Sequence, residues 1–320
     1  MTTLSVVIPT WDGLELLRGC LTALSQQTRP ADEVVVVDNG SRDGTAEALA
    51  EQWPDVRVVA LPENLGFAGG VNAGIRASTG ERVVLLNNDA LARPDFLAEL
   101  LAADARGGPR LGAVTAKVVG DDGRLQDTGD FLTAWGLAVQ RGNGEPDDGR
   151  YDHDLDVTSA CGGACLWRRE ALEDVGLLAE EFFAYFEDLD LGLRARLRGW
   201  HVRYAPAAVV VHAVSATSSR IPWFRQYHSS RNLWWLVVRC VPSPQLPSVL
   251  ARLALWQAKG LAGAARRGQL RTTLRAHRDA ARGLPAALRT RRAVQQGRVP
   301  DAAPLLSPSR RSLTPRAPTA

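Results

Sequence analysis

Residues 33–41 read Glu-Val-Val-Val-Val-Asp-Asn-Gly-Ser, a β-branched run that closes on polar and turn-forming residues. Such a run predicts a strand buried on both faces, as in a parallel sheet. Three more runs of this kind flank it, and two of them also end on polar residues. They are Leu4–Ile8 before Pro9-Thr10, Val56–Leu61, and Arg82–Leu86 before Asn87-Asn88-Asp89.

Segments with helical spacing separate these strands. We expect Ser41 or Asp43 to cap the second helix, and Pro94 to occupy the first position of the fourth. Strands that alternate with helices indicate an α/β fold, with a Rossmann-like, mostly parallel sheet covered by helices on both faces. The expected helices are Leu14–Gln26, Thr45–Gln52, Gly66–Ser78 after a glycine-rich turn, and Pro94–Ala103.

Polar residues at the carboxyl ends of these strands should share one rim of the sheet, where such folds bind ligands. Thr10, Asp38 and Asn87–Asp89 lie at these ends. The Asp38 carboxylate suits a nucleobase N–H or a ribose hydroxyl, although it could simply begin a turn. The oxygen-rich residues 87–89 suit a hard divalent cation held partly by substrate phosphates, or a capping turn.

The second half of the chain is expected to add strands and helices to this sheet. Residues 121–156 read as loops or a short antiparallel excursion, and His212 ends the last strand. A lone histidine is usually a core residue, unless the fold brings it beside Asp89. The expected strands are Leu111–Val119, Cys161–Trp167, Val202–Tyr204 and Ala208–Val211, and the helices Arg169–Val175 and one ending at Gly199.

Residues 182–190 place four aromatic side chains before the carboxylates Glu187, Asp188 and Asp190. Apolar neighbours and adjacent like charges both disfavour ionisation, so a carboxylate here is suited to take a proton. The alternative is an acidic helix N-terminus that complements the helix dipole.

Charge divides the chain into an acidic body and a basic C-terminal region. Residues 220–320 contain 19 basic and 2 acidic residues, and residues 1–219 the remaining 19 of 38 basic and 33 of 35 acidic residues. The basic region is rich in tryptophan and matches no common nucleic-acid-binding pattern. We therefore expect a helical region over 220–299 that meets an anionic membrane surface rather than nucleic acid, or is a solvated appendage. A disordered tail is expected over 300–320.

Cysteine and hydropathy patterns indicate a cytoplasmic protein. The four cysteines form neither a disulfide framework nor a zinc-site pattern. We expect no signal peptide and no transmembrane helix, so any membrane contact would be peripheral, on the inner face of the plasma membrane.

Taken together, these residues resemble glycosyltransferase family two, inverting enzymes with a GT-A fold, and most of all its rhamnosyltransferase-type branch, with galactofuranosyltransferases close by. The similarity covers about residues 3–215. The motifs that carry it are Val6–Thr10, Val36–Ser41, Asn64–Phe67, Leu86–Asp89, Gly162–Ala164, Phe183–Leu191 and Val211-His212.

The resemblance implies a role for particular residues. Asp188 would be the general base and Glu187 would position the acceptor. Asp89 and His212 would bind Mg²⁺ or Mn²⁺, together with Asn87, where the strict motif has an acid; one anionic ligand fewer should weaken metal binding. Donor-binding residues would be Pro9, Thr10, Asp38, Asn64, Gly66, Asn72 and Asn88.

The resemblance predicts transfer of a sugar, with L-rhamnose from dTDP-rhamnose preferred over a UDP-linked donor, to a cell-envelope glycan or lipid-linked acceptor. Arg231 is followed by Asn232 rather than by the tryptophan of processive synthases, so one or a few sugars should be added. Two alternatives stay open: a sugar nucleotidyltransferase, and a nucleotide- or glycan-binding module without turnover.

Overall fold

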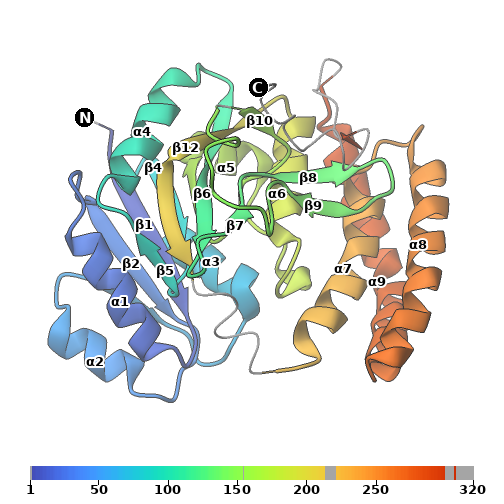
Figure 1. The fold of residues 1–320 in the computed structure, drawn as a ribbon, viewed down its shortest axis with the longest axis horizontal. Coiled ribbons are helices and arrows are strands. Elements are labelled where there is room, and N and C mark those ends of the chain that lie inside the picture. Colours follow the sequence, from blue (N-terminus) through green and yellow to red (C-terminus); the bar gives the residue numbers. More distant parts are fainter. Residues whose placement is uncertain (1, 154, 213–220, 300–305, 308–320) are drawn as a thin grey trace.

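The computed structural model describes residues 2–153, 155–212, 221–299 and 306–307. Its first half is a parallel β/α unit (Figure 1). Residues Thr10 and Asp38 lie side by side in the register of β1 and β2, so both strands end at the same rim. The strands are β1 (Leu4–Thr10), β2 (Glu33–Asp38), β3 (Arg57–Ala60) and β4 (Arg82–Leu86), and the helices α1 (Leu14–Ser25), α2 (Thr45–Gln52), α3 (Gly66–Ala77) and α4 (Phe96–Arg106).

The sheet continues beyond β4 in the order β10-β12-β6-β11-β4-β1-β2-β3, where β10 is Leu155–Val157. Strand β6 (Leu111–Gly120) runs parallel to β12 (His201–His212), and β11 (Ala164–Arg168) lies antiparallel between β6 and β4. Strand β5 (Ala90–Ala92) pairs with the end of β12 and sets Ala90 opposite His212. The α/β class with a mostly parallel sheet is therefore confirmed.

One sequence prediction about this part of the chain needs correction, and another is confirmed. The two strands predicted within residues 202–211 form one strand, because β12 absorbs Pro206 in an irregularity between Ala205 and Val209. The region 121–156 is the expected antiparallel excursion. It holds β7 (Leu125–Asp127), β8 (Asp130–Thr133), β9 (Ala138–Gln140) and β10 (Leu155–Val157).

The helix starts also differ from expectation. Helix α2 has Gly44 in a left-handed conformation at its N-cap, while Asp43 accepts the backbone N–H of Leu14 and Ser41 accepts that of Asp12. These two side chains therefore tie the β2–α2 loop to the β1–α1 loop, and Asp43 also accepts the hydroxyl of Thr45, the first residue of α2, at 2.5 Å. Pro94 precedes the N-cap Asp95 rather than taking the first helical position.

Alternating side chains of the strands build one apolar core on each face of the sheet. Val6 packs into the core on one face, and its neighbour Val7 into the core on the other. Helix α3 approaches the second face closely, because a Cβ on Gly74 would lie 2.2 Å from Val7 Cγ1. The valine runs therefore bury both faces, as a parallel sheet requires.

The C-terminal helices form a layer beside the sheet domain (Figure 1). Asp190, fully buried, pairs with Arg194 at 2.7 Å and with Arg239 at 2.9 Å. Burial acts to raise the pKa of Asp190, but the two guanidinium groups outweigh it and lower that pKa. The layer consists of α7 (Phe224–Cys240), α8 (Leu246–Arg266) and α9 (Leu270–Gln296). The helical elements before it are α5 (Arg169–Val175), a 3-10 turn (Glu180–Phe182) and α6 (Glu187–Leu197).

Contacts between α6 and α7 thus cross the boundary predicted at residue 219, and the division into a catalytic domain and a helical region stays a prediction. Of the predicted tail, most lies outside the described residues, but Leu306–Ser307 form a strand, β13, beside β8. Among the described residues, no helix combines the length and the apolar character that a bilayer crossing requires.

Candidate active site

The rim of the parallel sheet brings Thr10, Asp38 and Asn88 together. The Asn88 side-chain amide donates to Thr10 Oγ1 at 2.9 Å, and the backbone N–H of Ser41 donates to Asp38 Oδ1 at 2.9 Å. Asp38 therefore does make the turn that the sequence allowed, while its other oxygen makes no hydrogen bond within the described part of the chain. Pro9 lies beside them at the end of β1, with its Cβ against Gly70.

The turn before α3 packs between the rim of the sheet and the aromatic loop of residues 183–186. Asn64 Oδ1 accepts the N–H of Gly66 at 2.8 Å, and Asn39 donates to the Gly66 carbonyl at 2.9 Å. Gly66 has φ +75°, and a Cβ there would lie 2.4 Å from the carbonyl oxygen of Phe183. A glycine is thus required both by backbone conformation and by close approach.

Asn72, one of the donor-binding residues that the resemblance implied, makes its hydrogen bonds within the protein. Its amide donates to Leu178 O at 2.8 Å and to Glu180 Oε1 at 2.9 Å, and its oxygen accepts the N–H of Leu178 at 3.0 Å. The side chain is buried and both of its amide hydrogens are bound, so it anchors the segment before Phe182. We therefore leave it out of the proposed donor site.

Asn87, Asp89 and His212 meet at one point, although Asn87 and His212 are 125 residues apart in sequence. His212 Nε2 lies 3.0 Å from Asp89 Oδ1 and 3.4 Å from the Asn87 amide nitrogen. No group of three or more His, Cys, Asp or Glu side chains suited to a metal is found among the described residues. A carboxylate and an imidazole this close fit a Mg²⁺ or Mn²⁺ ion that takes its remaining ligands from a substrate diphosphate.

Glu187 and Asp188 open helix α6, directly after Phe186, which is left-handed with φ 73°. Asp188 Oδ2 accepts the N–H of Gly162 at 3.1 Å. Burial raises the pKa of Asp188, against the opposing effect of the backbone N–H groups of Gly162 and Leu189. A half-buried carboxylate with a raised pKa is suited to accept a proton near neutral pH.

Glu187 is the more buried member of the pair, 4% exposed. Burial, and then the charge of Asp188, raise its pKa well above the usual value. Its Oε2 atom makes no hydrogen bond to the described residues. Because a buried polar atom without a partner is costly, this oxygen is available for a group that enters the site.

Two further carboxylates, Asp127 and Asp130, lie near Asp188 and were not singled out from the sequence. Burial raises the pKa of Asp127 to about 6, and burial together with the charges of Asp127 and Asp188 raises the pKa of Asp130 well above its usual value. Asp127 accepts the side-chain amide of Gln140 at 3.1 Å. The side of the site formed by residues 121–156 is therefore acidic, and its carboxyl groups bind protons more readily than exposed ones.

Asn232 on α7 holds the aromatic loop and was likewise missed. Its amide nitrogen lies 2.9, 2.8 and 2.8 Å from the carbonyl oxygens of Phe182, Ala184 and Tyr185. The loop needs such support, because Phe183, Tyr185 and Phe186 all have positive φ, each at a cost of about 1–3 kcal/mol. The sequence signal was only an asparagine in an amphipathic helix, 47 to 50 residues away along the chain.

A link of two glycines joins the Asp188 carboxylate to the Asp89–His212 pair. Gly162 donates its N–H to Asp188, and the carbonyl of Gly163 accepts the N–H of Asn87 at 2.9 Å. A Cβ on Gly163 would lie 2.7 Å from the Asn87 amide nitrogen. The sheet rim, the aromatic loop and this link together form one candidate site, in the arrangement expected for the glycosyltransferase class that the sequence resembles.

The comparisons agree with that class. The chain belongs to the family described as "Glycosyltransferase like family 2", whose sequence model matches residues 2–235. It is 30% identical over 249 residues to an N-acetylglucosaminyl-diphospho-decaprenol L-rhamnosyltransferase of Mycobacterium tuberculosis, which spans 68% of this chain and 78% of that protein. It is 32% identical over 226 residues to the O-antigen biosynthesis protein RfbC of Myxococcus xanthus, covering 67% of this chain and 17% of that protein.

Solved structures show the same fold. The mannosyltransferase PcManGT of Pyrobaculum calidifontis, in complex with GDP-Man and Mn²⁺, matches with a TM-score of 0.55 at 21% identity, over 92% of this chain and 85% of that chain. S. aureus TarS 1-349 in complex with UDP matches with a TM-score of 0.54 at 18% identity, over 92% and 90%. The family, the fold class and the activity of a transferase predicted from the sequence are thereby confirmed.

Proposed function

We propose that this glycosyltransferase transfers L-rhamnose from dTDP-rhamnose to a hydroxyl of a cell-envelope glycan or lipid-linked acceptor, with inversion at the anomeric carbon. The observation that carries the proposal is the two-glycine link, which holds the Asp188 carboxylate beside the Asp89–His212 pair. The choice of rhamnose is supported by the L-rhamnosyltransferase of Mycobacterium tuberculosis, which covers more than two thirds of this chain.

In the proposed mechanism, Asp188 accepts the proton of the acceptor hydroxyl as its oxygen attacks the anomeric carbon. Glu187, through its unpartnered oxygen, orients the acceptor. Asp89 and His212 would hold Mg²⁺ or Mn²⁺, with Asn87 beside them, and the bound cation would offset the negative charge that develops on the nucleoside diphosphate. Thr10, Asp38 and Asn88 would hold the nucleoside, and the loop 183–186 would exclude water.

Slow hydrolysis of the donor tests this function without a known acceptor. A panel of dTDP-rhamnose, UDP-galactofuranose, UDP-glucose and UDP-N-acetylglucosamine should yield Mn²⁺-dependent turnover of dTDP-rhamnose alone, and EDTA should abolish it. Asp188→Asn should lose the turnover, while Asp148→Asn, which changes an exposed ion pair with Arg150, should keep it. Turnover of another donor would overturn the rhamnose assignment, and binding without turnover, even when candidate acceptors are supplied, would favour a binding module.

We also propose that helices α8 and α9 bring the enzyme to the anionic inner face of the plasma membrane. On α9, Leu270, Leu274 and Leu288 are exposed, the last two by 51% and 52%. On α8, Trp256 is 45% exposed and shares a helix face with Arg252 and Lys259. An exposed apolar stripe flanked by cations is the pattern of an interfacial helix.

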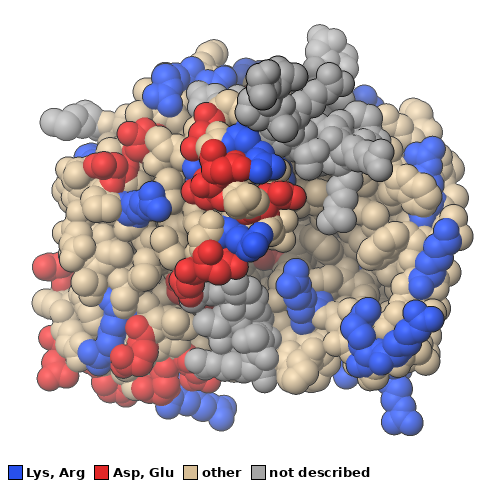
Figure 2. Space-filling model, viewed as in Figure 1, with Lys and Arg blue, Asp and Glu red and all other residues tan. Residues whose placement is uncertain are grey.

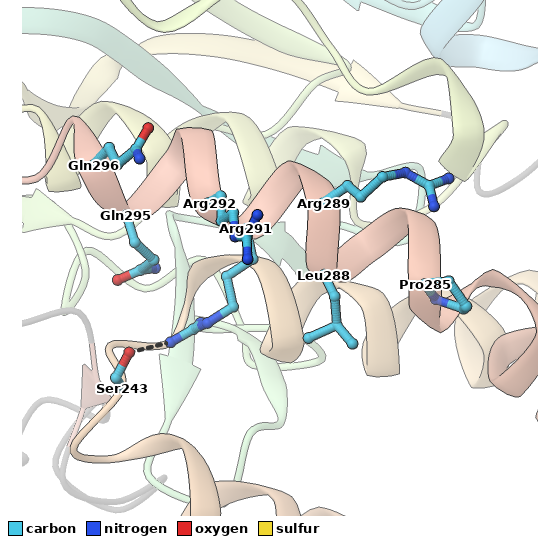
Figure 3. A pocket seen from close by; sticks show the side chains of 8 residues that line it. All are labelled: Ser243, Pro285, Leu288, Arg289, Arg291, Arg292, Gln295 and Gln296. Carbon is cyan, nitrogen blue, oxygen red and sulfur yellow. Dashed lines mark hydrogen bonds between the residues drawn. The ribbon is translucent and has the colours of Figure 1, made fainter.

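Charge supports the same proposal. Asp279 is the one acidic residue of α8 and α9, and Figure 2 shows lysine and arginine side chains along the edge that these helices form. Figure 3 shows a hollow beside α9, where Arg291 is bound to Ser243 at 2.8 Å and Arg289 extends away. Arg289 and Arg292 have no carboxylate partner among the described residues, so both are available for lipid phosphates.

Co-sedimentation of the full chain with vesicles of anionic and of zwitterionic phospholipid tests the membrane proposal. A chain cut at residue 219 is unsuitable, because it would remove Arg239, an ion-pair partner of the buried Asp190. We expect binding to anionic vesicles that falls with added salt and is weakened by Leu274→Ser or by Arg289→Gln with Arg292→Gln. Val58→Ser, at an exposed valine of the sheet domain, is the control, and equal partitioning of all variants would contradict the proposal.

A further inference from the structure

We propose that Gln126 is a positioning residue that fixes the hydrogen of the His212 ring on Nδ1 and so turns the Nε2 lone pair to the cation. This inference rests on the proposed metal site. Gln126 lies in β7, which pairs antiparallel with β6, and β6 in turn pairs with β12, where His212 is the last residue. The sheet thus brings together two residues that are 86 positions apart.

Both ends of the Gln126 amide bind the same residue. Its Nε2 donates to the backbone carbonyl of His212 at 2.9 Å, and its Oε1 lies 2.8 Å from His212 Nδ1. A carbonyl oxygen only accepts hydrogen bonds, so the amide nitrogen must face it and Oε1 must face the ring. An amide oxygen also only accepts, and therefore Nδ1 must carry a hydrogen.

This tautomer has a consequence at the other ring nitrogen. In a neutral imidazole with its hydrogen on Nδ1, Nε2 has only a lone pair. That lone pair lies 3.0 Å from Asp89 Oδ1, and two such electron-rich atoms repel unless a second ring proton or a cation lies between them. The ring is thus oriented for a divalent cation, as outer hydrogen bonds to metal-binding histidines commonly arrange.

The strand register leaves room for this arrangement. Gly120 is the neighbour of His212 in the pairing of β6 with β12. A Cβ at Gly120 would lie 2.9 Å from Gln126 Nε2, so a side chain there would displace the amide. Asn143 donates to the backbone carbonyl of Gln126 at 2.7 Å and holds the strand in place. The contact is therefore built into the sheet.

The tautomer can be read directly by NMR of the full chain with ¹⁵N-labelled histidine, without metal and at a pH where the ring is neutral. The chain has 5 histidines, and His212→Gln identifies the signal of interest. We expect the hydrogen on Nδ1 in the wild type and in Gln126→Glu, which keeps an acceptor. We expect it mainly on Nε2 in Gln126→Met, which has none. An Nε2–H wild type, or an unchanged Gln126→Met, would overturn the inference.

Metal affinity provides the second readout. With the full chain and dTDP present, free Mn²⁺ measured by EPR should show binding weakened by about 10–100-fold in Gln126→Met and by less than about threefold in Gln126→Glu. Gln52→Met, at an exposed glutamine that contacts Arg18, should bind as the wild type does. Wild-type affinity in Gln126→Met, or equal weakening in both Gln126 variants, would contradict the role. The tautomer is measured without a donor, so its result does not depend on whether the donor is dTDP-rhamnose. Failure of the proposed function and failure of the role of Gln126 can therefore be told apart.

Discussion

Replacing Asn232 by leucine tests whether α7 belongs to the catalytic unit. The leucine keeps the volume and removes the amide that reaches three carbonyl oxygens. The carbonyl oxygen of Phe182 would still accept a hydrogen bond from Arg231 at 2.9 Å. The carbonyl oxygens of Ala184 and Tyr185 would lose their side-chain donor. At about 1–3 kcal/mol for each buried group left unsatisfied, the ordered loop should be destabilised by about 3 kcal/mol. Because about 1.4 kcal/mol corresponds to a factor of ten, the ordered loop should become about 100-fold less populated relative to its relaxed form, and kcat/KM should fall by up to that factor.

Donor hydrolysis and thermal unfolding, measured side by side, separate a local effect from a global one. If the cost is confined to the loop, kcat/KM falls while Tm changes little; if it is global, Tm should fall by about 6 °C. The control is Ser230→Ala on the same helix, which removes a hydroxyl that accepts from Gln226 at 3.0 Å. Hydrolysis by Asn232→Leu within about threefold of the wild type would refute the reasoning that the strained loop needs this support.

Three further outcomes are expected. Asp188→Asn should lower kcat by about 10²–10⁴-fold without weakening donor binding, measured by calorimetry; an unchanged kcat would exclude Asp188 as the base. Because burial raises the pKa of Asp188, activity should rise with pH through a midpoint above the ordinary aspartate value of about 3.9, and a pH-rate profile without such a rise would contradict this. Gly66→Ala, whose Cβ would lie 2.4 Å from Phe183 O, should cost about 1–3 kcal/mol in urea unfolding and reduce hydrolysis; a neutral effect would show that the loop yields easily.

Local sequence patterns predicted the framework of this protein well, because strands and helices reveal themselves through the period of their apolar side chains. The valine runs gave β1, β2 and β4, and the polar residues after them gave the rim with Thr10 and Asp38. The prediction of the helix cap of α2 failed, because it considered only residues that are neighbours in sequence. Neither Ser41 nor Asp43 takes the N-cap position of α2, which Gly44 occupies, and both side chains bind backbone N–H groups of the neighbouring β1–α1 loop.

The sequence by itself determined the α/β alternation, the rim and the acidic start of α6, since each is written in residues that are neighbours along the chain. Only the tertiary structure decided which distant side chains complete the site. Gln126 reaches His212 across 86 positions, and Asn232 reaches Phe182 across 50. Single polar residues at such separations leave no periodic signal, and their role arises from strand register and helix packing, which fix the positions of atoms far apart in sequence.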